Sequence, residues 1–138
     1  MIYPRKIWVA INVPTEHLNK TLDGIKDMDK FSDAITITTG RTIPDRKGGI
    51  LIRFNKMEDV TASTVTHESI HAALFVFEYI DAVVNAENQE PFAYLSGWIA
   101  DCIWRVKTGK VEDWLRVTVF FSSRYMTTCI QQSNCLMV

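Results

Sequence analysis

The middle of the chain contains the stretch Val65-Thr66-His67-Glu68-Ser69-Ile70-His71-Ala72-Ala73, an HExxH signature inside a strongly apolar helical pattern. On an α-helix of about 3.6 residues per turn, His67 and His71 share one face and stand about 6 Å apart along the axis, so both imidazoles can bind one ion. Glu68 is rotated by about 100° from His67, which sets its carboxylate beside the metal as a base for bound water. The stretch predicts a zinc site with His67 and His71 as ligands and Glu68 as the catalytic carboxylate. The alternative is that His67 and Glu68 are ordinary helix-surface residues and that His71 is a core histidine.

The composition of the whole chain is that of a globular protein. The chain has 138 residues, of which 47% are hydrophobic and 22% are charged, and this is enough apolar material for a core. The formal net charge is −1, and no basic run or basic-aromatic stripe stands out. We therefore expect a single domain over residues 1–138 and no nucleic-acid partner.

The cysteines and the apolar segments indicate a cytoplasmic setting. Cys102, Cys129 and Cys135 are odd in number and lack CxxC spacing, which argues against a disulfide framework and against a thiolate zinc site. Residues 1–6 do not have the pattern of a signal peptide. The longest apolar stretch, residues 70–84, is interrupted by charged side chains and is too short to span a bilayer. Neither secretion nor membrane insertion is expected.

Strand patterns gather before the signature. Residues 7–13 are almost continuously apolar, which predicts a strand that is buried on both faces. Residues 34–39 and 50–54 are rich in β-branched side chains and flank a loop with proline and glycine, so we expect them to pair as a hairpin. Residues 50–54 come just before the signature helix and are the candidate for an exposed strand that binds an extended substrate. The alternative is an ordinary sheet strand. Residues 117–121 predict a last strand, whereas residues 122–138 show no usable periodicity.

The signature helix has candidate boundaries on both sides. Asp59 or Asn55 could cap its beginning, and its apolar pattern should run to about Tyr79 or Asp81. The helix is apolar on most sides, which is typical of a central helix covered by a sheet and by a neighbouring helix.

A second helix follows a polar connection. Pro91 stands in its first turn and Gly109 just beyond its end, as is common at helix boundaries. The small residues Ser96, Gly97 and Ala100 would allow a close approach to the signature helix. The patterns together predict an α+β fold, in which a small β-sheet packs against the signature helix and a second, antiparallel helix.

A catalytic zinc usually has three protein ligands and one open position, so the two histidines require a further partner. Glu90 is the leading candidate because it begins the second helix, and Glu87 and Asp101 are alternatives. If the signature helix continued to residue 84, Glu90 would enter about 15 Å or more beyond the level of His71. The signature helix must therefore end early, or the third ligand lies deeper, at Asp101.

This arrangement resembles the gluzincin class of zinc metallopeptidases, in which an HExxH helix is followed by a glutamate ligand on the next helix. The segment Gln89-Glu90-Pro91-Phe92-Ala93-Tyr94-Leu95 stands where that glutamate would be, and it is also similar to small phage and prophage proteins of gut bacteria. The resemblance covers residues 50–107. It implies a zincin-like domain with His67, His71 and Glu90 as zinc ligands and Glu68 as the general base.

The chain departs from the gluzincin pattern at one position. A gluzincin commonly has an aspartate four residues after its ligand glutamate, whereas this chain has Tyr94, so the support of a ligand histidine is altered. Tyr94 and Tyr125 are the candidates for stabilising a transition state.

Two functions of different classes follow from these patterns. The first is a zinc-dependent metallopeptidase that hydrolyses a peptide bond of a peptide or protein substrate with zinc-activated water. One branch of this hypothesis resembles the phage-lysogeny metallopeptidases that cleave a repressor. The alternative is a non-catalytic, phage-encoded protein-binding module that keeps the helical pair as a scaffold. Replacing Glu68 with glutamine would separate the two, because only catalysis requires the base.

Overall fold

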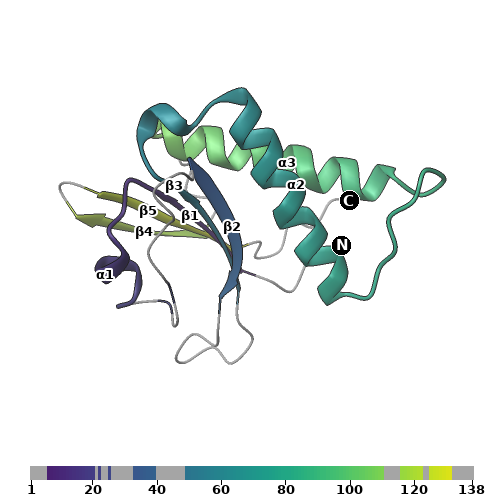
Figure 1. Cartoon of the computed structure of the whole chain (residues 1–138), viewed down its shortest axis with the longest axis horizontal. Coiled ribbons are helices and arrows are strands. Elements are labelled where there is room, and N and C mark those ends of the chain that lie inside the picture. The colour runs from purple at the N-terminus through teal and green to yellow at the C-terminus, as the bar shows by residue number, and fades with distance from the viewer. Residues whose placement is uncertain are drawn as a thin grey trace.

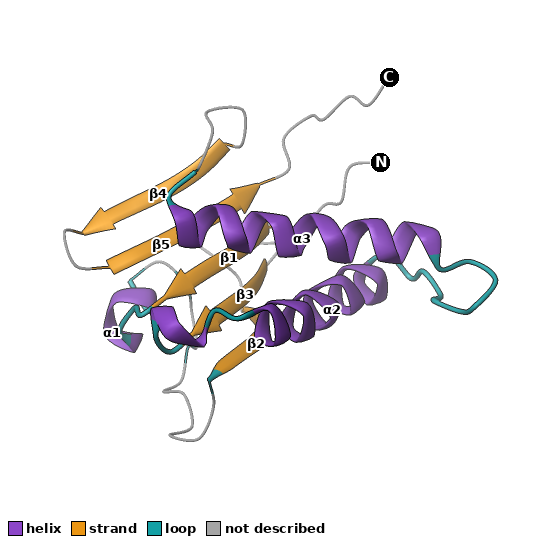
Figure 2. Ribbon diagram, turned by 90° about the horizontal axis from the view of Figure 1, so that it is seen from above, coloured by secondary structure: helices purple, strands orange, loops and turns teal. Residues whose placement is uncertain are grey.

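A β-sheet and two long helices dominate the described part of the chain. The structure, a computed structural model, describes residues 6–20, 22, 25, 33–39, 49–110, 116–122 and 125–131. The strands are β1 (Lys6–Ile11), β2 (Ala34–Thr39), β3 (Gly49–Phe54), β4 (Arg116–Ser122) and β5 (Tyr125–Gln131). The helices are α1 (Thr15–Leu18), α2 (Ala62–Tyr79) and α3 (Glu90–Thr108). Figure 1 and Figure 2 show α2 and α3 on one face of the sheet, which confirms the predicted α+β fold.

The sheet has the strand order β2-β3-β1-β5-β4. β1 and β3 are parallel, and the other neighbouring strands are antiparallel. β2 pairs with β3 with Ala34 opposite Phe54, which confirms the predicted hairpin of residues 34–39 and 50–54. The predicted last strand is β4, and β5, which the sequence patterns did not indicate, lies between β4 and β1.

The prediction that residues 50–54 form the exposed strand is wrong. β3 has a hydrogen-bonded neighbour on each side, and β2 is the edge strand. All six residues of β3 are buried, whereas most of β2 is only half-buried. A strand with apolar side chains on both faces buries most of its surface in the interior of a sheet, which explains why β3 lies there.

The sheet is covered on both faces because β1 has apolar side chains on both faces and β3 adds Leu51 to the face opposite α2 and α3. On the face toward α2 and α3 the strands contribute Ile7, Val9, Ile11, Ile50, Ile52 and Phe54. On the opposite face the buried layer consists of Trp8, Ala10, Val13, Leu18, Leu22, Ile25 and Leu51. These layers confirm the prediction that the first strand is buried on both faces, and they give α2 a fixed platform.

The start of α2 differs from the prediction. The cap is Thr61, whose Oγ1 accepts a hydrogen bond of 3.2 Å from the backbone N–H of Thr64. The Thr64 hydroxyl oxygen accepts in return from the Thr61 backbone N–H at 3.0 Å. Asp59 instead closes a separate 3₁₀ turn by accepting from the backbone N–H of Lys56, and Asn55 precedes that turn. Each threonine hydroxyl accepts a hydrogen bond from the backbone N–H of the other threonine. The pair therefore caps the helix in place of a carboxylate.

The end of α2 agrees with the prediction, since the helix stops at Tyr79. The chain leaves the helix through Asp81, which has a left-handed φ of 55°. The backbone N–H of Ala82 donates to the Phe77 carbonyl at 2.9 Å, and that of Asp81 donates to the Glu78 carbonyl at 3.2 Å. This pair of bonds is the pattern of a Schellman termination, with aspartate where glycine is common.

α3 returns antiparallel to α2. The Lys107 ammonium donates to the carbonyl of Val60 at 2.6 Å, so the end of α3 lies at the start of α2. At the other end, the rings of Phe77 and Phe92 meet edge to face with centroids 5.6 Å apart. These contacts confirm the predicted antiparallel pair. Gly97, however, is exposed and a Cβ at this position would meet nothing within 4 Å, so it does not mediate a close approach.

The boundaries of α3 match the prediction. Pro91 lies in the first turn, and Gly109 follows the last turn with a left-handed φ of 68°. In the part of the chain that the structure describes, no helix combines the length and the apolar character needed to cross a membrane.

Candidate metal centre

His67 and His71 approach each other closely on the outer surface of α2. Their Nε2 atoms are 3.1 Å apart, and the ring centroids are 4.7 Å apart with an interplanar angle of 70°. Two nitrogens that each bind a tetrahedral zinc at 2.0–2.1 Å would be about 3.3–3.4 Å apart. The pair therefore fits two ligands of one zinc ion with little movement of either ring.

The position of the histidines follows from the burial of α2. At about 100° per residue, the buried residues of the helix gather on the side toward the sheet and α3, and the histidines fall on the other side. The buried residues are Val65, Glu68, Ser69, Ala72, Ala73, Val76 and Phe77. Both histidines are exposed, so a metal ion and a ligand from outside can reach them.

Glu68 occupies the side of α2 next to the edge strand β2. Only 6% of this residue is exposed, and its Oε2 accepts a hydrogen bond of 2.6 Å from the hydroxyl of Thr36. The same hydroxyl lies 3.3 Å from the backbone carbonyl of Glu68. A hydroxyl that donates to a carboxylate forms one of the stronger hydrogen bonds in proteins, so the carboxylate is held toward β2. Sequence patterns did not single out Thr36, which stands 32 residues before Glu68.

The alternative interpretation of the signature agrees poorly with these positions. It required Glu68 on the helix surface and His71 in the core. The structure places His67 on the surface, as this interpretation also required, but Glu68 is buried and His71 is exposed. A carboxylate is rarely buried without a partner or a function, whereas an exposed histidine pair is open to a metal ion.

The edge of β2 is open next to this carboxylate. Within the described residues, β2 pairs only with β3, so its other edge has no strand partner there. An unpaired strand edge can accept a further extended chain through backbone hydrogen bonds. Thr36 thus links the strand edge to Glu68.

Glu90 lies away from the histidines. The contact of Phe92 with Phe77 places Glu90 approximately level with Tyr79, roughly 12 Å along the helix direction from His71. Among the described residues there is no group of three histidine, cysteine, aspartate or glutamate side chains that could hold a metal ion. The separation arises because α2 continues about two turns beyond the histidines before the chain reverses.

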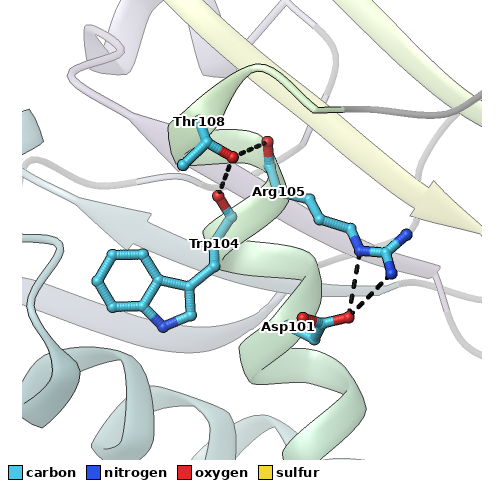
Figure 3. A network of polar contacts seen from close by, with 4 residues as sticks. All are labelled: Asp101, Trp104, Arg105 and Thr108. Atoms are coloured by element: carbon cyan, nitrogen blue, oxygen red, sulfur yellow. Dashed lines mark hydrogen bonds and ion pairs between the residues drawn. The ribbon is translucent and has the colours of Figure 1, made fainter.

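The alternative third ligands also lie elsewhere. Glu87 is exposed in the connection before α3, where its backbone N–H donates to the side chain of Asn85 at 3.0 Å. Asp101 accepts hydrogen bonds of 3.1 Å from the Arg105 guanidinium, as Figure 3 shows. Its side chain is 61% exposed on α3 and is paired within its own helix. A hollow of about 310 Å³ next to this pair is lined by Asp101, Trp104, Arg105, Thr108 and Lys110.

Tyr94 points away from α2. It is 75% exposed and lies about 200° around the helix axis from Phe92, which contacts Phe77 of α2. The structure therefore does not bring Tyr94 to the histidine pair. Tyr125 begins β5, and its side chain lies outside the described part of the structure.

Cys102 is a buried free cysteine on α3. Burial raises the pKa of its thiol from 9.0 to about 12, partly offset by the positive charge of Arg105. The thiol is therefore protonated near neutral pH and does not act as a thiolate ligand there.

No known protein family matches the chain, and neither a curated protein nor a solved structure is significantly similar to it. The arrangement of the site is thus the basis for assigning a function.

Proposed function

We propose that this chain is a zinc-dependent metallopeptidase of the HExxH type. The observation that carries the proposal is the convergence of the His67 and His71 Nε2 atoms to 3.1 Å on an exposed helix face. On the neighbouring side of the same helix, Thr36 holds the buried Glu68 carboxylate. The two nitrogens would be two of the three usual protein ligands of a catalytic zinc, and the neighbouring carboxylate would be the base that metal-assisted hydrolysis uses.

His67 and His71 would hold the ion through their Nε2 atoms, because neutral imidazole nitrogens suit zinc. When bound, zinc supplies Lewis acidity, which lowers the pKa of a water molecule and polarises a carbonyl group. The exposed position of both rings leaves room for the water molecule and the substrate.

Glu68 would act as the general base. Its Oε2 is fixed by the Thr36 hydroxyl, so we assign Oε1 as the atom that accepts the proton of the attacking water. The water oxygen bonds to the peptide carbonyl carbon, and the C–N bond then breaks. Glu68 passes its proton to the departing amine nitrogen, which returns the carboxylate to its starting state.

The open edge of β2 would bind the substrate as an added strand. Such a segment forms backbone hydrogen bonds that do not depend on its sequence, and it would pass beside Glu68. The substrate class is therefore an extended peptide or an unfolded segment of a protein.

The first test is zinc content measured by elemental analysis of the purified protein. We expect about one zinc per chain, and the double variant His67→Ala/His71→Ala should lose it. His17→Ala is the matched control, because His17 lies on α1 and not on α2, so its zinc content should equal that of the wild type. Stoichiometric zinc in the double variant would contradict the assignment of the ligands.

The second test separates catalysis from metal binding. Glu68→Gln should retain zinc and lose at least about 100-fold in kcat/KM on a peptide library, because glutamine cannot accept the proton. Hydrolysis at the wild-type rate by this variant would show that Glu68 is not the base.

A non-catalytic binding module is the second candidate function. It is favoured by the exposure of Ile70 and Leu74, which are 40% and 44% exposed beside the histidines. This function predicts that no peptide is cleaved and that Glu68→Gln has no effect on partner binding.

A further inference from the structure

The outer face of α2 carries more than the two histidines. Leu74 follows His67 by seven residues, or about two helical turns, and Glu78 follows it by eleven, or about three turns. At about 100° per residue, both therefore lie within about 20° of His67 around the helix axis. Ile70 lies beside them. We call the five exposed residues His67, Ile70, His71, Leu74 and Glu78 the outer stripe of α2. It has metal-binding nitrogens at one end, apolar side chains in the middle and a carboxylate at the other end.

The metal site of one chain is incomplete within the described residues. The histidines provide two ligands, and no third histidine, cysteine, aspartate or glutamate joins them there. Glu90 lies roughly 12 Å from His71 along the helix direction, and Asp101 pairs with Arg105. Glu78 follows His71 by seven residues, or about 10 Å along the axis, so it cannot reach the histidines of its own helix.

We propose that a second copy of this chain completes the zinc site, with Glu78 of one copy as the third ligand beside His67 and His71 of the other. The inference rests on the proposed zinc site and adds a subunit to it. Two α2 helices would meet antiparallel through their outer stripes, about a two-fold axis at the level between residues 72 and 73. Glu78 of one copy then lies level with His67 of the other, and Leu74 lies level with His71.

This arrangement uses the same contact twice, as expected for an interface with two-fold symmetry. Helices in contact lie about 8–10 Å apart, a distance that side chains as long as histidine and glutamate can bridge together. Glutamate oxygen is an established zinc ligand, at about 2.0–2.2 Å. The dimer would therefore contain two zinc sites, each built from both copies.

The middle of the outer stripe fits the same arrangement. Ile70 and Leu74 are 40% and 44% exposed, and the second copy would cover both. The apolar part of the contact consists of only Ile70 and Leu74 from each copy, whereas stable protein interfaces bury roughly 1,200 Å² or more. The apolar contact alone is thus too small, and we expect the dimer to require zinc.

The dimer would leave the catalytic side of the site open. Around the axis of α2, Glu68 lies about 60° from His71, on the side toward β2. Ile70 lies about 60° from His67, on the opposite side of the histidine pair. The histidines separate these two sides, so the second copy approaches from the side of Ile70. The edge of β2, whose Thr36 hydroxyl contacts the buried Glu68 carboxylate, would remain uncovered by the second copy.

The first experiment measures molar mass by light scattering in the presence of zinc and in the presence of a chelator. The wild type should be a dimer with about one zinc per chain, and the chelator should convert it to a monomer. Glu78→Gln should lower the zinc affinity by more than about 100-fold and abolish the dimer, because a charged ligand is lost. Glu87→Gln removes an exposed carboxylate outside the outer stripe and should leave both properties unchanged.

The decisive experiment mixes two defective variants. The His67→Ala/His71→Ala chain lacks the nitrogens but retains Glu78, and the Glu78→Gln chain retains the nitrogens. Each variant alone should remain monomeric with weak zinc binding. Their mixture should form a heterodimer with one tightly bound zinc, because one of its two sites then has all three ligands.

The outcomes separate this inference from the proposed function. Tight zinc binding by a monomer, unaffected by Glu78→Gln, would overturn the shared site and leave the proposed peptidase intact. A zinc-dependent dimer that recovers zinc on mixing but cleaves no peptide would support the shared site and contradict the peptidase. A wild-type chain that binds no zinc would reject both.

Discussion

At the scale of single residues, the contact between Thr36 and Glu68 is the feature that sets this site apart from a helix with two exposed histidines. The hydroxyl of an edge strand holds the carboxylate at 2.6 Å, and the carboxylate is almost fully buried. A buried carboxylate that loses its donor is destabilised by about 1–3 kcal/mol. Under the proposed function, Thr36 would be a positioning residue that acts through Glu68.

The first prediction concerns Thr36→Val, which removes the hydroxyl while keeping a β-branched side chain. We expect unchanged zinc content, a fall in kcat/KM of about 10–100-fold, and a loss of about 1–3 kcal/mol in the free energy of unfolding. Thr36→Ser keeps the donor and should retain most of the activity. The measurements are peptide hydrolysis, elemental analysis and urea denaturation. Equal activity of the valine and wild-type chains would contradict the positioning role.

The second prediction concerns Glu90, which the resemblance to gluzincins implies as the third ligand. In the structure it begins α3, roughly 12 Å along the helix direction from His71. Glu90→Gln should therefore change the zinc affinity by less than about threefold, and it should cost about 0.3–1 kcal/mol of stability through the helix dipole. Competition with a zinc chelator measures the affinity. A loss beyond about 100-fold would show that the start of α3 moves to the metal.

At the scale of elements, the two glycines of α3 have opposite roles. Gly97 lies inside the helix, is exposed, and has nothing within 4 Å of the position of a Cβ. Gly109 ends the helix with a φ of 68°, a conformation that side chains with a Cβ rarely adopt. The same substitution at the two positions should therefore have opposite effects on stability.

The third prediction is that Gly97→Ala raises the free energy of unfolding by about 0.8–1 kcal/mol, because alanine is the better helix former. Gly109→Ala should lower it by about 1 kcal/mol, because alanine is strained in the left-handed region. Urea denaturation of the two variants beside the wild type provides the test, and each variant is the control for the other. A loss of stability in Gly97→Ala would mean that another surface covers this position.

At the scale of the whole molecule, Cys102 couples global unfolding to pH. Its pKa is about 12 in the folded chain and 9.0 when exposed, because burial disfavours the thiolate. Below pH 9 the Cys102 thiol is protonated in both the folded and the unfolded chain. Its full contribution to the free energy of unfolding is therefore present there. Above pH 9 the unfolded chain releases the proton while the folded chain retains it, so stability falls as the pH rises toward 12.

The fourth prediction follows from this linkage. Between pH 9 and 12, Cys102 should lower the free energy of unfolding by roughly 1.4 kcal/mol per pH unit. Cys102→Ala should show a correspondingly smaller decline when urea midpoints are measured from pH 8 to pH 10. Its lower stability at pH 8, caused by the small cavity, does not affect this comparison of slopes. Parallel pH dependences of the two chains would contradict the shifted pKa.

The sequence by itself determined the features that depend on neighbours within one or two helical turns. The spacing of His67 and His71 brings their nitrogens together because helix geometry sets that distance. Pro91 and Gly109 mark the ends of α3 for similarly local reasons. The α+β fold and the pairing of β2 with β3 also followed from local patterns, because β-branched runs that flank a loop with proline and glycine favour paired strands.

Only the tertiary structure decided which distant residues meet. The order of the strands depends on how much apolar surface each strand can bury, so β3 lies inside the sheet and β2 forms the edge next to Glu68. The contact of Thr36 with Glu68 requires that strand order. The position of Glu90 depends on where α2 ends and on how α3 packs against it. Such contacts join segments far apart in the chain, and no local pattern encodes them.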